Sequence, residues 1–210
     1  MTRQFSISTL TCAMVLSLLA TSPPGASAQD ASSPLTLASA KVSIAGTSNI
    51  HEFEAVTREV SVTRISLAKG VAGAGVIASV LNPGAVEGFD LAIRAASLSS
   101  PREGLDKNMH KALKVEEFKD ITFRLIRLEG KGGALKAIGT LTIAGVAREV
   151  GFELNTKESA SAVHITGEVP LLMTDYGIAP PKAMLGMLKT DPKIVVRFDV
   201  VLATPSTFTR

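Results

Sequence analysis

Most of the chain after residue 34 alternates apolar and polar side chains with a period of two, which is typical of β-strands with one buried face. In GFDLAIRAASL (88–98), Phe89, Leu91 and Ile93 are apolar, whereas Asp90 and Arg94 lie between and after them. The same alternation recurs in KVSIAG (41–46), REVSVTRISL (58–67), DITFRLIRLEG (120–130), ALKAIGTLTIAG (134–145), AREVGFELNT (147–156), AVHITGEVPLLM (162–173) and KIVVRFDVVLA (193–203). About eight strands separated by turn signals predict an all-β domain, either a closed barrel or a sandwich.

One segment, SPREGLDKNMHKALKVEEF (100–118), has helical spacing instead. Its apolar positions are Leu105, Met109, Ala112 and Leu113, and its basic positions are Lys107, His110, Lys111 and Lys114. This pattern predicts one amphipathic helix inserted between strands. Its basic face fits either simple solvation or transient contact with an anionic head group or membrane surface.

Two connections are unusual. Residues 68–88 are rich in glycine and alanine, and we expect a weak strand within a long flexible connection there. The connection 174–192 (TDYGIAPPKAMLGMLKTDP) is apolar and much longer than the about two to five residues of a hairpin loop. Because loops usually lie on the surface, so many apolar side chains predict that this one covers something.

The N-terminal residues predict export. A charged start with Arg3 is followed by the apolar run LTCAMVLSLLA (10–20) and by Ala26-Ser27-Ala28, which is the order of a cleavable signal peptide. We expect cleavage after Ala28, so that residues 29–210 form one domain. The single cysteine, Cys12, lies inside the signal, and the mature chain would therefore form no disulfide.

Composition and motifs argue against several functions. A net charge of +3 with one tyrosine and no tryptophan does not favour nucleic-acid binding. The three histidines, His51, His110 and His164, are isolated, so we expect no metal site and no catalytic residues. An enzyme remains a minor alternative, as a lipid hydrolase or isomerase that would use His51 or Asp175.

Four segments together resemble the YceI-like family of exported bacterial proteins, often called polyisoprenoid-binding. They are GTSNIHEFEA (46–55), REGLDKNMHKALKVEEFKDITF (102–123), GTLTIAGVAREVGFEL (139–154) and MTDYGIAPPKAMLGMLKTDPKIVVRFDVVL (173–202). The resemblance runs from about Leu35 to Ala203, and it is weakest at SNIHEFEA and at residues 68–88. It implies a lipocalin-like antiparallel β-barrel of about eight strands with one inserted amphipathic helix and a long capping loop.

The resemblance also implies a binding or carrier function in the periplasm, with a role in envelope stress and without a cofactor. The ligand would be a long-chain amphiphile such as a polyisoprenoid, an isoprenoid quinone or a fatty amide. We expect its chain to contact Phe53, Met109, Leu113, Phe118, Phe123, Met173, Tyr176, Ile178, Met184, Leu185 and Met187, and its head group to contact Asn108, Lys111 and Asp175. The alternative is a scaffold protein whose barrel is plugged by the 174–192 loop. A monomer and a homodimer both stay open.

Overall fold

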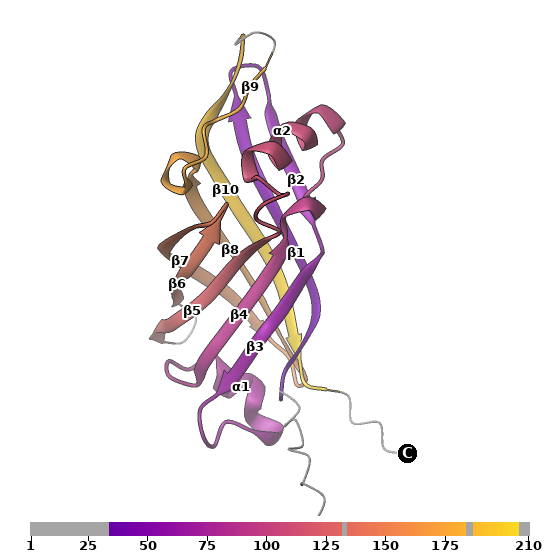
Figure 1. Ribbon diagram of the computed structural model, residues 1–210. Coiled ribbons are helices and arrows are strands. Elements are labelled where there is room, and N and C mark those ends of the chain that lie inside the picture. Colours follow the sequence, from indigo (N-terminus) through magenta and orange to yellow (C-terminus); the bar gives the residue numbers. More distant parts are fainter. Residues whose placement is uncertain (1–33, 132–133, 184–186, 206–210) are drawn as a thin grey trace, which may run out of the picture. The chain divides into compact units, whose positions relative to one another are not determined.

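One antiparallel sheet, curled around an apolar interior, forms most of the structure (Figure 1). The computed structural model describes residues 34–131, 134–183 and 187–205. Its strands are β1 (Thr36–Ser48), β2 (Glu52–Thr57), β3 (Val60–Leu67), β4 (Val86–Arg94), β5 (Asp120–Lys131), β6 (Ala134–Ile143), β7 (Val146–Glu158), β8 (Ala162–Leu172), β9 (Lys182–Ala183) and β10 (Leu188–Ala203). They pair in the order β2-β1-β10-β8-β7-β6-β5-β4-β3, and the short β9 pairs with β10. The expected barrel-like all-β fold is thus confirmed.

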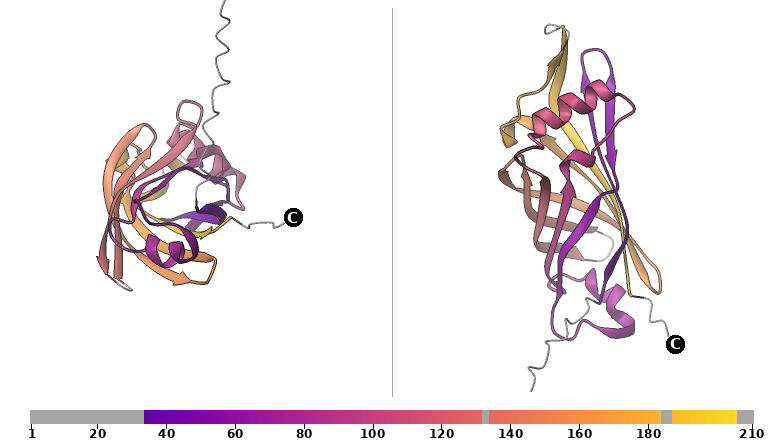
Figure 2. Two further views of the ribbon diagram at one scale, coloured as in Figure 1. Left: turned by 90° about the horizontal axis from the view of Figure 1, so that it is seen from below. Right: turned by 45° about the vertical axis from the view of Figure 1, so that its right-hand side comes forward.

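The sheet is a half-barrel because its two edge strands, β2 and β3, do not pair with each other (Figure 2). The segment that follows β4 bridges this edge, through the short helix η2 (Ala95–Ser97) and the residues after it. The Val56 N–H donates to the Ser99 carbonyl at 2.8 Å, and the Ser99 N–H donates back at 3.1 Å. These bonds satisfy backbone groups of β2 that a free sheet edge would leave exposed.

The interior is lined by the inward positions of the period-two pattern, including Phe89, Leu91 and Ile93 as the sequence predicts. Three aromatic rings meet there, with Phe123 and Phe152 at 5.6 Å and Phe152 and Phe198 at 5.4 Å between ring centroids. The Phe198 ring lies over Gly167, its partner on β8, where an added Cβ would stand 2.5 Å from the ring. Glycine is therefore required at this position for the ring to lie flat against the sheet.

Helix α2 (Glu103–Leu113) lies across one end of the half-barrel (Figure 2). Its apolar face, with Met109, Ala112 and Leu113, packs on the core as the sequence predicts. The ring of His110 bonds the carbonyl oxygen of buried Leu98 at 2.8 Å, which ties the helix to the segment after β4.

The helix ends at Lys114, which adopts a left-handed conformation (φ 52°, ψ 49°) and donates its N–H to helix carbonyls.

Within the described ranges no helix is both long and apolar enough to cross a membrane.

Residues 68–88 are not the weak strand that we expected. They contain the short helices η1 (Gly73–Gly75) and α1 (Val76–Val80), and β4 begins only at Val86. Val76, Ile77 and Val80 share one helical face, which is buried against the end of the barrel opposite α2. Burial of this face stabilises a helix too short to form alone.

The connection 174–192 is also more regular than predicted. It contains the end of the short helix η3 (Met173–Tyr176), then β9 and the first five residues of β10. The sequence did not indicate that β10 begins before Pro192, because proline is unfavourable within a strand. The structure accommodates Pro192 where the β1–β10 register shifts, between the pairs Gly46–Ile194 and Ser48–Thr190.

Candidate functional site

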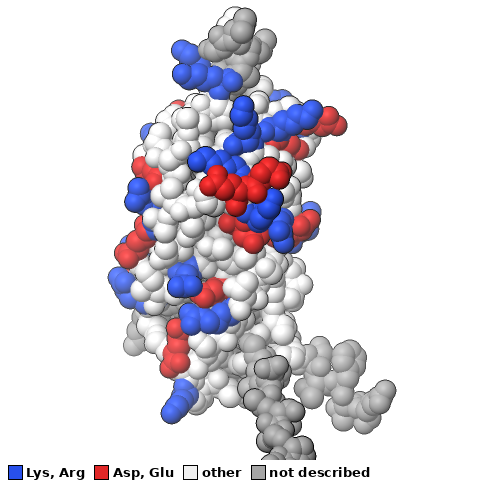
Figure 3. Space-filling model, viewed as in Figure 1, with Lys and Arg blue, Asp and Glu red and all other residues white. Residues whose placement is uncertain are grey.

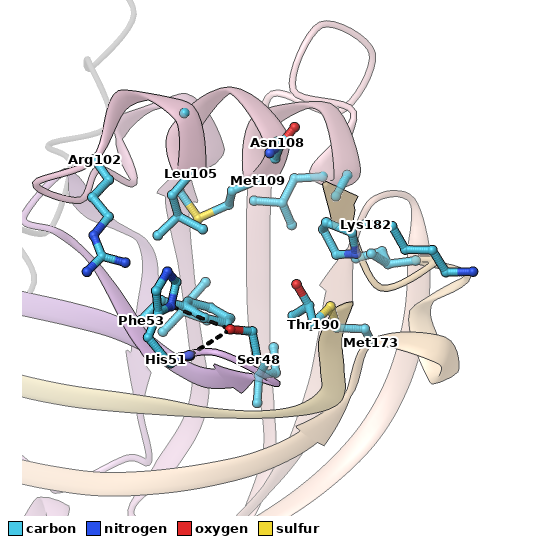
Figure 4. Close-up of a pocket in the computed structure, with 17 residues that line it drawn as sticks. Ser48, His51, Phe53, Arg102, Leu105, Asn108, Met109, Met173, Lys182 and Thr190 are labelled. Atoms are coloured by element: carbon cyan, nitrogen blue, oxygen red, sulfur yellow. Dashed lines mark hydrogen bonds between the residues drawn. The ribbon is translucent and has the colours of Figure 1, made fainter. Parts of the chain in front are cut away.

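A cavity of about 360 Å³ lies beneath helix α2 (Figure 4). Helix α2 covers it, and β1, β2, β10 and the segment after η3 form its floor and sides. Its apolar lining consists of Ile44, Phe53, Leu105, Met109, Ala112, Leu113, Met173, Ile178, Pro181 and Ile194. Its remaining lining residues are Ser48, His51, Arg102, Gly104, Asn108, Lys182 and Thr190.

The floor of this cavity follows from one cross-strand row. Gly46 on β1 pairs with Ile194 on β10 and with Phe53 on β2. An added Cβ on Gly46 would lie 2.5 Å from the tip of the Phe53 ring, so the ring rests directly on the glycine. The glycine thus makes room for an aromatic surface that faces the cavity.

A second cavity of about 170 Å³ lies deeper in the half-barrel. Every described residue that lines it is apolar, and Phe89, Phe123, Phe152 and Phe198 are among them. On β1 the lining continues from Ile44 to Val42, and on β10 it continues from Ile194 to Val196. Because residues two apart in a strand share a face, the two cavities follow one another along the same apolar surface.

Polar groups lie at the mouth of the cavity beneath α2. Arg102 extends toward His51, and the amino end of Lys182 points away from the cavity (Figure 4). In the part of the chain that the structure describes, neither Arg102 nor Lys182 forms an ion pair, and no carboxylate lines this cavity. The mouth is therefore polar and cationic, whereas the interior is apolar.

The Ser48–His51 pair at this mouth does not form a nucleophile and its base. The Ser48 hydroxyl donates to the His51 carbonyl at 2.8 Å and accepts the His51 N–H at 3.1 Å. Its oxygen is 3.5 Å from His51 Nδ1, at the outer limit for a hydrogen bond. The hydroxyl of Ser48 thus closes a turn, and Asp175 lines neither cavity.

Seven of the residues expected to contact ligand lie at these cavities. Phe53, Asn108, Met109, Leu113, Met173 and Ile178 line the cavity beneath α2, and Phe123 lines the deeper one.

Five other expected residues do not line either cavity. The Phe118 ring packs on Gly145, Lys111 and Asp175 are exposed, and the Met187 residue is 66% exposed. Tyr176 is only 3% exposed, and its hydroxyl has no hydrogen-bond partner among the described residues. Burial, followed by the nearby Asp175 carboxylate, raises the pKa of Tyr176. Met184 and Leu185 lie outside the described residues.

Sequence reasoning missed several lining residues. Ile44 and Ile194 were assigned to strands, but alternation alone does not say which inward side chains border a space. Arg102 and Lys182 carried no sequence signal for the site, because single basic residues beside a helix or a loop are common on protein surfaces. Within the described segments, no group of three His, Cys, Asp or Glu side chains could hold a metal ion.

Comparison with known proteins agrees with this architecture. The profile of the YceI-like domain matches residues 38–202. BcnA from Burkholderia cenocepacia superimposes with a TM-score of 0.61 at 14% identity, covering 77% of this chain and 95% of that one. No curated protein matches the sequence.

Two further solved structures share the fold. A polyisoprenoid binding domain from Saccharophagus degradans gives a TM-score of 0.58 at 14% identity, covering 82% of this chain and 99% of that one. The YCEI protein of Campylobacter jejuni gives 0.52 at 18% identity, covering 74% and 82% of the two chains. At these identities the likeness shows the fold.

Proposed function

Because the chain belongs to the YceI-like family, we propose that it binds and carries a long-chain hydrophobic amphiphile. The observation that carries the proposal is the pair of successive cavities, apolar inside and polar at the mouth beneath α2. An apolar chain would lie along this surface, and its polar end would stay at the mouth. The name of the Saccharophagus degradans neighbour, a polyisoprenoid binding domain, supports this class of ligand.

The cavity sizes constrain how such a ligand enters. The cavity beneath α2, at about 360 Å³, is near the lower end of the about 300–1,000 Å³ of ligand pockets. A polyisoprenoid or quinone tail longer than this space must continue into the deeper cavity of about 170 Å³. Met109 and Met173 line the first cavity, and their flexible side chains can repack around an entering chain.

The binding energy would come mainly from the tail. Each buried methylene contributes about 0.8 kcal/mol, so about ten of them supply roughly 8 kcal/mol before the cost of ordering the chain. A dissociation constant of about 1 μM needs about 8 kcal/mol of net binding free energy, so a tail that also offsets the costs of association and ordering must bury more methylenes than ten or add polar contacts at its head. A polyisoprenoid, an isoprenoid quinone and a fatty amide all offer such a tail.

The cellular setting is part of the same proposal. The apolar run 10–20 and the Ala26-Ser27-Ala28 site support export to the periplasm by cleavage after Ala28. A carrier there would handle its amphiphile within the cell envelope, with a role in envelope stress and without catalysing a reaction. The engaged hydroxyl of Ser48 and the separate location of Asp175 support this non-enzymatic function.

Titration of the purified protein with a prenol, an isoprenoid quinone and a fatty amide tests this proposal. Binding is read by native mass spectrometry. Ala112→Phe fills the cavity beneath α2 and should weaken binding at least tenfold, because the added ring occupies the space of the tail.

Lys107→Phe places the same ring on the exposed face of the same helix and serves as the matched control. Binding that survives Ala112→Phe unchanged, or that is absent from the unaltered protein for all three ligands, would favour the plugged-scaffold alternative.

A further inference from the structure

The two most exposed large apolar residues of the described chain lie at one end of the molecule. Ile50, in the turn between β1 and β2, is 60% exposed, and Met187, just before β10, is 66% exposed. The other two exposed large apolar residues are Ile126, at 47%, and Leu172, at 37%. We define Ile50 and Met187 as the apolar tip.

Backbone and side-chain hydrogen bonds hold the two parts of the apolar tip together. The Asn49 side chain donates to the Met187 carbonyl at 2.8 Å and accepts the Lys189 N–H at 2.8 Å. The Asn49 N–H also donates to the Lys189 carbonyl at 3.1 Å. The turn between β1 and β2 and the paired strands β9 and β10 lie beyond α2 at the same end of the half-barrel (Figure 1). These hydrogen bonds hold the turn that carries Ile50 next to the segment that carries Met187.

The apolar tip adjoins the mouth of the cavity beneath α2. Ser48 and His51, which flank Ile50 in the sequence, both line that cavity. On the other ribbon, Lys182 and Thr190 line it on either side of Met187. A surface that receives the apolar tip would consequently face the cavity mouth.

The charges around the apolar tip favour an anionic surface. Lys182, Lys189 and Lys193 are exposed on the β9–β10 ribbon, and Figure 3 shows Lys and Arg side chains on one side of this end. Carboxylates are also present near Lys193: Glu52 and Glu54 line one surface hollow with it, and Asp191 accepts its backbone N–H at 2.8 Å. Exposed apolar side chains beside lysines are typical of segments that enter the head-group layer of an anionic bilayer.

We propose that Ile50 and Met187 insert into the head-group layer of an anionic membrane while Lys182 and Lys189 bind its phosphates. The cavity mouth then opens onto the bilayer, where a hydrophobic amphiphile is already dissolved. This surface differs from the basic face of α2 that the sequence suggested. It requires no ligand in the barrel and can be tested separately.

The chain contains no tryptophan, so a single introduced tryptophan reports its own surroundings. Ile50→Trp is compared with Ile126→Trp, which lies on strand β5, away from the apolar tip. On vesicles of phosphatidylcholine and phosphatidylglycerol, the Ile50→Trp emission should shift to the blue and be quenched by brominated lipid. The Ile126→Trp emission should not change. Equal responses at both positions, or none at position 50, would overturn the proposal.

Cosedimentation with the same vesicles measures how much each group contributes. Ile50→Ser with Met187→Ser should weaken binding at least tenfold, because both apolar side chains are lost. Lys182→Glu with Lys189→Glu should weaken vesicle binding at least 25-fold, at about fivefold per lysine removed. Added salt should likewise weaken vesicle binding by the unaltered protein. Ile126→Ser is the matched control. Unchanged binding by the Ile50–Met187 double variant refutes insertion.

Further comparisons test two alternatives to membrane insertion and distinguish this proposal from the proposed ligand binding. If Lys107→Glu with Lys111→Glu abolishes vesicle binding while the apolar-tip variant binds normally, the basic α2 face is the docking surface and the proposal is wrong. If the apolar-tip variant instead converts a dimer into a monomer, with vesicle binding unchanged, the partner is a second copy. Uptake of a prenol, quinone or fatty amide from solution should be the same in the apolar-tip variant and the unaltered protein.

Discussion

Replacement of Gly46 by alanine should have opposite effects on stability depending on whether the Phe53 ring is present. In the native protein the added Cβ would lie 2.5 Å from Cζ, 3.0 Å from Cε1 and 3.2 Å from Cε2 of that ring. Ordinary carbon contacts are about 3.5–4.0 Å, so the ring must move by about 1 Å. The cavity beneath α2 offers the space, so the ring would move into it.

The size of the effect follows from two opposing contributions. Overpacking of this kind costs about 1–3 kcal/mol. Replacing glycine by alanine at an allowed backbone conformation recovers about 0.4–1 kcal/mol, because the unfolded chain loses freedom. Gly46→Ala alone should therefore lower the free energy of unfolding by about 1 kcal/mol. In the Phe53→Ala background the ring is absent, and the same change should raise it by about 0.5 kcal/mol.

Urea unfolding of the four proteins of this double-mutant cycle measures both signs at an unchanged m-value. Gly104→Ala is the matched control, since an added Cβ there meets nothing within 4 Å, and it should stabilise α2 in both backgrounds. The reasoning is refuted if Gly46→Ala and Phe53→Ala are additive within about 0.5 kcal/mol. Ligand binding should also be weaker in Gly46→Ala, because the displaced ring occupies the cavity.

Three other predictions concern single side chains that pack in or against the core. Phe123→Ala should lower the free energy of unfolding by about 3–5 kcal/mol in urea, because a buried ring leaves a cavity; a loss below about 1 kcal/mol would contradict its place in the core. His110→Ala should cost about 1–3 kcal/mol by leaving the buried Leu98 carbonyl unpaired, and unchanged stability would disprove the bond. Tyr176, the single tyrosine, should titrate above 10.0 in tyrosinate absorbance. Because the pKa of Tyr176 is raised in the folded protein, the protonated hydroxyl contributes fully to the free energy of unfolding below pH 10.0. That contribution is lost as the pH rises through the folded pKa, and Tyr176→Phe should remove this alkaline loss.

The strands were predictable because a half-buried sheet imposes its period on the sequence. Phe89, Leu91 and Ile93 face the interior for the reason that their alternation indicates. Helix α2 was predictable for the same reason, since its apolar residues recur at helical spacing. In both cases the spacing of apolar residues along a short segment indicates which side chains are buried, so the element can be predicted from that segment alone.

The rest depended on distant contacts. The α1 face of Val76, Ile77 and Val80 is helical only because the end of the barrel buries it, and glycine and alanine around it weaken the pattern. The early start of β10 depends on pairing across the Pro192 irregularity with β1.

The candidate site could be predicted only in part, because some of its residues line the cavity through contacts between distant segments. Phe53 and Met109 could be identified from their apolar character, whereas Ile44 and Arg102 border the cavity only because of where α2 docks.

Native mass spectrometry of the protein isolated from its own host, followed by organic extraction, tests the central claim most directly. We predict a discrete amphiphile that is released on denaturation, present with the unaltered protein and Lys107→Phe and depleted from Ala112→Phe. Protein that is isolated without ligand, and that afterwards takes up neither prenol, quinone nor fatty amide, would contradict the claim that the half-barrel carries a hydrophobic ligand.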